Sequence, residues 1–209
     1  MRYYLIAGEA SGDMHGANLI KGILQHDPTA EFRFWGGDKM QAVCGNTPVK
    51  HIKDLAFMGF LEVVKHLPTI LGNISFCKAD ILQYKPDAVI LIDYPGFNFR
   101  LFEFLKQHQL KLIYYISPQL WAWKKNRVFK VKAFVDRLYV IFPFEVDFYK
   151  NYGVEAHYFG HPLLDEIHPK DYATHQAPQA VQPTIALLPG SRKQEISYLL
   201  PEYMKVAKR

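Results

Sequence analysis

The sequence is poor in cysteine and lacks long apolar runs. Its 209 residues include only Cys44 and Cys77, too few for a disulfide framework, so two reduced thiols in a cytoplasmic protein are favoured over a bridge. The apolar stretches fall well short of the roughly 20 residues that a membrane-crossing helix needs, and no signal peptide precedes the first apolar run. We therefore expect a cytoplasmic protein, or one that associates peripherally with a membrane face.

The signatures of several enzyme classes are also missing. The chain has no G-x-S-x-G, Walker or H-E-x-x-H motif, and residues 8–13 lack the G-x-G-x-x-G spacing of dinucleotide-binding proteins. Its nine histidines show no metal-ligand spacing, because His157 and His161 straddle Gly160 and are not expected to share a helix face. We therefore expect neither a metal nor a cofactor.

Apolar and basic residues are plentiful. Hydrophobic residues make up 49% of the chain and aromatic residues 15%, which is enough for one full domain and part of another. The formal net charge is +5 and the pI about 9.0. This balance suits an anionic partner, but it does not distinguish nucleic acid from a phosphorylated sugar or an anionic membrane.

Short apolar runs alternate with helical patterns along the chain. Strands are expected at 2–7, 31–35, 87–93, 111–116, 137–142, 155–159 and 184–188, and helices at 13–25, 68–84, 98–108, 123–133, 144–151 and 193–208. Several of the strands are continuously apolar, as strands buried on both faces of a parallel sheet should be. The alternation predicts an α/β fold with a doubly wound parallel sheet.

The alternation is interrupted at 161–183, a segment rich in Pro, His and Gln that lacks periodicity. The residues after it supply only one strand, one Gly turn and one helix, and a single βα unit cannot bury both of its faces. We therefore expect a Rossmann-like N-terminal domain at 1–160 and a linker at 161–183. Residues 184–209 would begin a second domain whose remainder is absent.

Ligands of open α/β sheets bind beyond the carboxyl ends of the strands. The segment that follows the first strand is GEASGD, at 8–13. Its glycines would let backbone amides approach a ligand, and the helix after it would present its positive end to an anion. Ser11 or Asp13 could equally be a plain N-cap of that helix.

Two later turns also carry charged groups. Asp93, in IDYPGFN, closes an apolar strand and is either a general base that faces the cleft or a cap of the turn. The turn LPGSR, at 188–192, offers backbone amides and Arg192, which would suit a pyrophosphate.

Two further segments have both a structural and a functional interpretation. The apolar FMGFLEVVKHLPTIL, at 57–71, is core by default and otherwise an exposed patch that dips into a bilayer surface. SPQLWAWKKNRVFKVK, at 117–132, interleaves tryptophans with basic residues. A solvated helix face, an anionic ligand or membrane surface, and stacking on nucleic-acid bases all fit this second pattern.

The order of these stretches is more specific than any one of them. The chain presents in succession GEASGD, LAFMGFLEVVKHLP, IDYPGFN, YYISPQLWAWKKNRVFK, FPFEVDFYKNYGV, FGHPLLD and LLPGSR. Over essentially its whole length it resembles the lipid-A-disaccharide synthases, bacterial glycosyltransferases of the two-domain GT-B type. The resemblance implies inverting transfer of 2,3-diacylglucosamine from UDP-2,3-diacylglucosamine to 2,3-diacylglucosamine 1-phosphate (lipid X). The products would be the β-1,6 lipid A disaccharide 1-phosphate and UDP.

The resemblance also assigns roles to residues. Asp93 would be the catalytic base. The substrate-binding residues would be Gly8, Glu9, Ser11, Gly12, Asp13, Asn98, Gly190, Ser191 and Arg192, the last near the donor's phosphates. Gly96 stands where the family has an acidic residue, which puts more weight on Asp93 alone. Most of the donor site would lie in the second domain, so we expect the 209-residue chain to be inactive by itself.

Substrates with four acyl chains between them imply a membrane. The lipid-facing residues would be Phe60, Leu61, Val63, Val64, Leu67, Ile70 and Leu71, together with Lys124, Lys125 and Arg127. The expected partners are the UDP-diacylglucosamine donor, the lipid X acceptor and the anionic inner-membrane surface, and not nucleic acid. The alternatives are an enzyme like UDP-N-acetylglucosamine 2-epimerase and a non-catalytic lipid- or anion-binding module.

Overall fold

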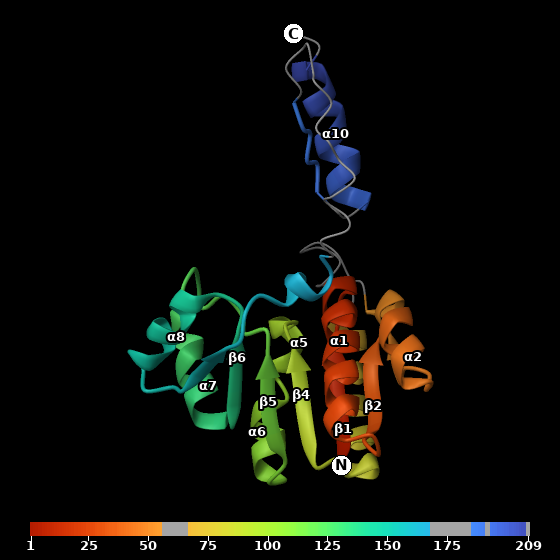
Figure 1. Cartoon of the computed structure of the whole chain (residues 1–209), viewed down its shortest axis with the longest axis vertical. Helices are drawn as coiled ribbons and strands as arrows, with labels where there is room; N and C mark the ends of the chain where they lie inside the picture. Colours follow the sequence, from red (N-terminus) through yellow and green to blue (C-terminus); the bar gives the residue numbers. More distant parts are fainter. Residues whose placement is uncertain (56–66, 168–184, 191–192, 208–209) are drawn as a thin grey trace. The chain divides into compact units, whose positions relative to one another are not determined.

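The computed structural model describes residues 1–55, 67–167, 185–190 and 193–207. The chain divides into two compact units, Met1–Ile167 and His168–Arg209 (Figure 1).

The first unit is built around a parallel sheet. Its strands are β1 (Arg2–Ala7), β2 (Glu31–Gly36), β3 (Lys50–His51), β4 (Ala88–Ile92), β5 (Lys111–Tyr115), β6 (Arg137–Val140) and β7 (Ala156–Tyr158). Within the described residues they form one seven-stranded sheet in the order β3-β2-β1-β4-β5-β6-β7, with every neighbouring pair parallel. The chain runs from β1 outward to β3 on one side and then from β4 outward on the other. The strand order therefore reverses between β1 and β4.

Helices connect the strands of this sheet. They are α1 (Ala10–His26), α2 (Asp38–Cys44), α4 (Leu67–Tyr84), α5 (Pro95–Asn98), α6 (Phe102–Gln107), α7 (Val128–Phe134) and α8 (Pro143–Lys150). Short 3₁₀ turns lie at η1 (Ile52–Asp54), η2 (Lys125–Arg127) and η3 (Pro162–Asp165).

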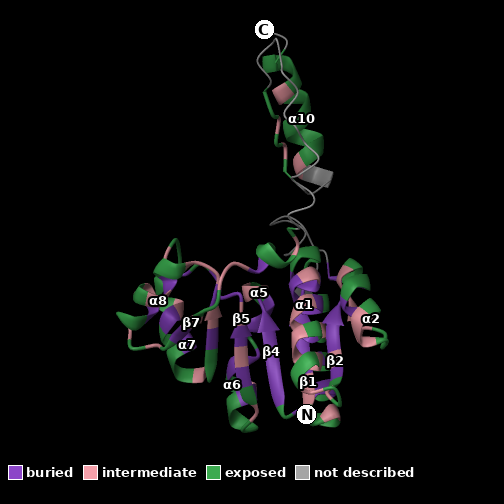
Figure 2. Ribbon diagram, viewed as in Figure 1, coloured by how far each residue is buried: buried purple, intermediate pink, exposed green. Residues whose placement is uncertain are grey.

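The sheet is buried on both faces, as the continuous apolar runs predict. Along β1, Tyr4 and Ile6 belong to the hydrophobic cluster that α4, α6 and α7 complete. Leu5 and Ala7 belong to a second cluster, which α1 and α2 complete. Successive side chains of a strand point to opposite faces, so helices cover both sides of the sheet. The central strand β4 is buried along its whole length (Figure 2).

The prediction of a doubly wound parallel α/β sheet is confirmed, but two expected helices are divided. The helix expected at 98–108 is split into α5 and α6, because the N–H groups of Arg100 and Leu101 bond three residues back and tighten the chain into a turn. The helix expected at 123–133 begins only at Val128, after Lys124 adopts a left-handed φ of 54°. Neither α2 nor the two-residue β3 was predicted.

The domain boundary also differs in detail from the expectation. Residues 161–167, expected in a linker, pack with the first unit: η3 lies against α1, and Asn18 donates a hydrogen bond from Nδ2 to Oε1 of Glu166 at 2.7 Å. The rest of the expected linker lies outside the described residues. The role of 184–209 as the start of a second domain stays a prediction.

In the second unit, the described residues are 185–190 and the helix α10 (Lys193–Ala207). The strand expected at 184–188 is not found, since residues 185–190 carry no regular secondary structure. A strand is defined by its hydrogen bonds to a neighbouring strand, and the described residues of this unit contain none.

Candidate active site at the carboxyl edge of the sheet

The residues that follow β1 and β4 meet at one edge of the sheet. The register pairs Ala7 with Ile92, the last residues of these two neighbouring strands. Gly8 and Asp93 therefore begin adjacent loops at the point where the strand order reverses. This is the place where open α/β sheets bind their ligands.

The two loops are in direct contact through Tyr94. A Cβ atom on Gly8 would lie 2.4 Å from the Tyr94 ring, closer than any side chain permits. Gly8 is buried, and the close approach of the ring explains why this position lacks a side chain. Gly12 has a similar packing reason, since its Cβ would lie 3.2 Å from the Cβ of Ala7 in β1. That these glycines admit a ligand to the backbone stays a prediction.

Asp13 joins the first helix to the second. Its side chain is buried and accepts hydrogen bonds from the backbone N–H groups of Gly37, Lys39 and Met40, at 2.7, 3.0 and 3.1 Å. Gly37 is the N-cap residue of α2, and Lys39 and Met40 lie in its first turn, where backbone N–H groups have no partners within the helix. Asp13 thus caps α2 from α1, and its contact with substrate stays a prediction.

Glu9, Ala10 and Ser11 are the exposed residues of the GEASGD segment, and Glu9 and Ser11 are the two of them that carry polar side chains. Glu9 is the N-cap residue of α1, and Ser11 lies in the first turn of that helix. Among the residues predicted in this segment, these two side chains are accessible to a ligand at the carboxyl edge.

Asp93 has an unusual backbone conformation. Its φ is 45°, that of Tyr94 is 46°, and that of Ile116 directly after β5 is 61°. Non-glycine residues in this region cost on the order of 1–3 kcal/mol each and gather at functional sites. The Asp93 N–H still donates to the carbonyl of Tyr115 at 3.1 Å, so the chain leaves the sheet sharply at this residue.

The carboxyl group of Asp93 is well suited to accept a proton. Burial raises the pKa of the Asp93 carboxyl, and the nearby carboxylate of Glu9 raises it further, while a hydrogen bond from the Tyr94 backbone opposes the shift. A raised pKa makes the carboxylate a stronger base. Sequence reasoning identified Asp93 but not Tyr94, because the contact of Tyr94 with Gly8 depends on the strand order.

Asn98 and Gly96 lie on the short helix that follows. Asn98 is fully buried, and its Nδ2 donates to the backbone carbonyl of Asp93 at 2.7 Å. Asn98 therefore contacts the backbone of the candidate base and not its carboxylate. Gly96 is exposed, and a Cβ added there would have no atom within 4 Å. An acidic side chain would therefore fit at this position, and its absence here has no steric cause.

The described residues predicted to face lipid differ in exposure. Lys124 and Lys125 are exposed, and Nζ of Lys124 lies 4.1 Å from the ring centroid of Trp123, which is itself 60% exposed. Arg127 is half-buried, with its guanidinium 5.0 Å from the centroid of the Phe99 ring. The lysines can therefore meet a surface, whereas Arg127 packs beside the candidate site.

The apolar segment is only partly described. Leu71 is 49% exposed, and Ile70 is half-buried against the core. Leu67 begins α4, and its side chain is not described. Four further predicted residues lie outside the described residues: Phe60, Leu61, Val63 and Val64.

The predicted donor-binding turn belongs to the second unit. Gly190 has a φ of 100°, which favours glycine, and a Cβ there would lie 2.5 Å from the carboxylate of Glu195. Ser191 and Arg192 lie outside the described residues. The donor-binding role of this turn stays a prediction.

Hollows lie at both the carboxyl and the amino ends of the strands. One of about 260 Å³ is bounded by the ends of β5, β6 and β7, with Tyr115, Tyr139, His157 and Phe159 in its wall. It adjoins the candidate site, because the carbonyl of Tyr115 accepts the N–H of Asp93.

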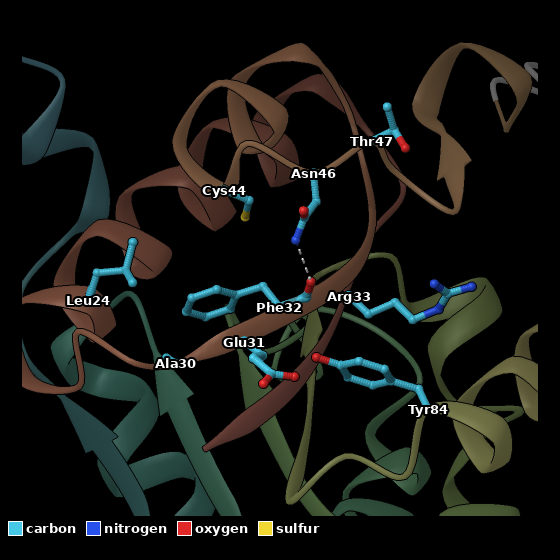
Figure 3. A pocket seen from close by; sticks show the side chains of 9 residues that line it. All are labelled: Leu24, Ala30, Glu31, Phe32, Arg33, Cys44, Asn46, Thr47 and Tyr84. Atoms are coloured by element: carbon cyan, nitrogen blue, oxygen red, sulfur yellow. Dashed lines mark hydrogen bonds between the residues drawn. The ribbon is translucent and has the colours of Figure 1, made fainter.

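A second hollow, of about 570 Å³, lies at the start of β2 (Figure 3). Its wall includes Cys44, and burial raises the pKa of this thiol to about 11. The thiol is therefore protonated at neutral pH and a weak nucleophile. We assign no reaction to this second hollow.

Across the described residues, no group of three or more His, Cys, Asp or Glu side chains is arranged to hold a metal ion. None of the helices in the described part of the chain has the length and apolar character needed to cross a bilayer.

A comparison with protein families gives one match over nearly the whole chain. The model of the family described as Lipid-A-disaccharide synthetase matches residues 3–209. Curated proteins named lipid-A-disaccharide synthase are similar: that of Acidobacterium capsulatum is 43% identical over 99% of this chain and 52% of its own length. That of Trichlorobacter lovleyi is 41% identical over 99% of this chain and 55% of its own length. The chain spans about half the length of the curated relatives it matches.

Solved structures share the fold at low sequence identity. A UDP-N-acetylglucosamine 2-epimerase matches with a TM-score of 0.57 and 12% identity, over 85% of this chain and 53% of its own. The UDP-GlcNAc 2-epimerase of Neisseria meningitidis, bound to UDP-GlcNAc, has a TM-score of 0.54 and 11% identity, over 79% of this chain and 48% of its own. At this identity the likeness shows the fold alone.

Proposed function

Since the chain belongs to the lipid-A-disaccharide synthetase family, we propose that it forms the acceptor-binding half of an inverting glycosyltransferase. The donor is UDP-2,3-diacylglucosamine and the acceptor is 2,3-diacylglucosamine 1-phosphate. The 6-hydroxyl oxygen of the acceptor attacks C1 of the donor sugar, and the bond from C1 to the UDP oxygen breaks. UDP leaves with the electron pair, and the acceptor proton passes to a base.

The carboxylate of Asp93 is the base in this proposal. The observation that carries the assignment is its place: it follows β4 at the reversal of the strand order, half-buried, with a pKa raised first by burial and then by Glu9. A raised pKa brings the carboxyl closer to the working pH and improves proton transfer. Inversion requires only one displacement, so a single base on the attacking hydroxyl is sufficient.

The exposed residues of the first loop bind the acceptor. Ser11 lies in the first turn of the 17-residue helix α1, whose amino end carries a partial positive charge. This end suits the acceptor phosphate or a sugar hydroxyl. Glu9 is close enough to Asp93 to raise the pKa of its carboxyl, and its carboxylate would accept a hydrogen bond from the same sugar.

The donor diphosphate is held by the turn at 188–192. Backbone amides of Gly190 and Ser191 and the guanidinium of Arg192 are suited to phosphate oxygens. Charge on the departing UDP is stabilised in this way.

The protein associates peripherally with the cytoplasmic face of the inner membrane. Acylated substrates reside in a bilayer, and the exposed pair Lys124 and Lys125 beside the exposed ring of Trp123 suits anionic head groups. Leu71 is the described exposed residue of the apolar segment that would meet the acyl region.

The test is Asp93→Asn in a full-length protein that contains this chain and the C-terminal half found in its relatives. Transfer from UDP-2,3-diacylglucosamine to lipid X is measured at saturating substrate. We expect kcat to fall by about 10²- to 10⁴-fold, the usual contribution of a general base. Asp147→Asn, at an exposed position of α8, is the matched control and should retain activity.

Undiminished transfer by Asp93→Asn would refute the proposed base. Incubation of the unmodified protein with UDP-GlcNAc alone tests the rival reaction, since epimerisation without an acceptor would favour an epimerase. Absence of both reactions would favour a binding module.

A further inference from the structure

The backbone carbonyl of Asp93 is held by two buried side chains. Nδ2 of Asn98 donates to it at 2.7 Å, and the hydroxyl of Tyr114 donates to it at 2.7 Å. Asn98 comes from α5 and Tyr114 from β5, and both residues are fully buried. The same oxygen is thus fixed from two different elements.

These two bonds supply hydrogen-bond donors to the Asp93 carbonyl, which lies in a left-handed turn. At Asp93 the N–H remains in the sheet ladder with Tyr115, but φ is positive and the carbonyl accepts its hydrogen bonds from two side chains. A buried carbonyl must find another donor, or its desolvation destabilises the fold. The side chains of Asn98 and Tyr114 supply that donor and so stabilise a conformation that is unfavourable by itself.

We propose that Asn98 and Tyr114 are positioning residues for the catalytic carboxylate: by holding the Asp93 carbonyl they fix the backbone from which that carboxylate projects. This inference rests on the proposed function, because it serves the same base. It also gives Asn98 a different task from the substrate contact that the family resemblance implied.

The Tyr114 hydroxyl can be removed with little disturbance. Its ring packs edge-on against Phe99 and Phe102, with centroids 6.2 and 5.9 Å away. Phenylalanine keeps these contacts, so Tyr114→Phe deletes one hydrogen bond and leaves the core filled. Asn98→Ala deletes the other bond.

A matched control exists in the same core. Tyr149 is also fully buried, and its hydroxyl bonds to Ser117 and donates to the carbonyl of Pro118 at 3.3 Å. Tyr149→Phe therefore removes a buried tyrosine hydroxyl that does not touch Asp93. Any general effect of such a loss on stability is common to Tyr114→Phe and Tyr149→Phe.

The experiment measures kcat, KM for lipid X and the pH profile of kcat/KM in the full-length protein. For Tyr114→Phe and Asn98→Ala we expect kcat to fall by about 10- to 100-fold, the effect of misplacing a reacting group by about 1 Å. We expect KM to change little. Burial is the main cause that raises the pKa of Asp93, so a looser loop would expose the carboxylate and lower its pKa. The acid limb of the profile should then move to lower pH, while Tyr149→Phe leaves kcat and this limb unchanged.

The outcomes separate the two proposals. If Asp93→Asn abolishes transfer but Tyr114→Phe and Asn98→Ala keep wild-type kcat and the same acid limb, the positioning role is wrong and the proposed base stands. If Asp93→Asn is fully active, the proposed base is wrong and this inference fails with it, although the transferase function stands. Equal losses in Tyr114→Phe and Tyr149→Phe would indicate a merely structural role. Titration of the Asp93 carboxyl by NMR in the 209-residue chain gives a second reading, since the same variants should lower its pKa.

Discussion

At the scale of single residues, the site depends on contacts between loops that are distant in the sequence. Asp93 could be predicted because it ends a continuous apolar run, and a strand of that kind places its last residue at the carboxyl edge. The role of Tyr94 could not be predicted in the same way. Its ring lies on Gly8, 86 positions earlier, and this contact exists because β1 and β4 are neighbours.

The contact between Gly8 and Tyr94 leads to a prediction about stability. In Gly8→Ala the new methyl would overlap the Tyr94 ring, so the ring or the loop must shift. Forcing extra atoms into a packed site costs about 1–3 kcal/mol. Urea unfolding of the 209-residue chain should show this loss.

Gly72→Ala is the matched control for this change. Gly72 lies inside α4, and a Cβ there would meet nothing within 4 Å. Alanine should stabilise that helix by about 0.5–1 kcal/mol. A Gly8→Ala variant as stable as the parent would mean that the ring does not lie where the structure places it.

At the scale of elements, the apolar pattern of the sequence predicts the central strands of the sheet, but it does not predict the short elements that connect to them. The runs that form β1, β4 and β5 are apolar on both faces, and burial between two helix layers requires that. By contrast, β3 has two residues and α2 seven, which is too short for a periodic signal. The start of α2 is fixed instead by Asp13, a residue of another helix.

The cap of α2 is open to a direct test. Asp13→Ala leaves three buried or partly buried backbone amides without their acceptor, and we expect a loss of about 1–3 kcal/mol in the free energy of unfolding. Asp13→Asn keeps one side-chain oxygen and should lose less. Hydrogen exchange at Gly37 and Met40 should accelerate most in Asp13→Ala, and unchanged protection at these amides would contradict the assignment.

At the scale of the whole molecule, the net charge bears on the partner of the protein and the chain length on its activity. The net charge is +5, but charge alone does not select a partner. The exposed pair Lys124 and Lys125 lies beyond β5, in the loop that follows its carboxyl end.

Because the chain spans about half the length of its curated relatives, we expect no transfer by the 209-residue chain alone.

Membrane association can be tested by reversing charge at this loop. Lys124→Glu with Lys125→Glu should weaken binding to anionic vesicles by more than about tenfold, since each basic residue near such a surface contributes about 1 kcal/mol. Vesicle sedimentation at low salt measures the change. The same reversal at Lys106 and Lys111, exposed residues at the amino edge of the sheet, should have a smaller effect. Equal losses in both pairs would indicate attraction by net charge only.

The ring of Tyr94 has one more consequence, for motion. Because it rests on the backbone of Gly8, the turn that carries Asp93 and the turn that carries Glu9 are coupled mechanically. Neither turn can swing by itself without opening a gap under the ring. We therefore expect the two acidic groups to travel together when substrate enters, so that their spacing is preserved and any hinge lies outside this pair of turns.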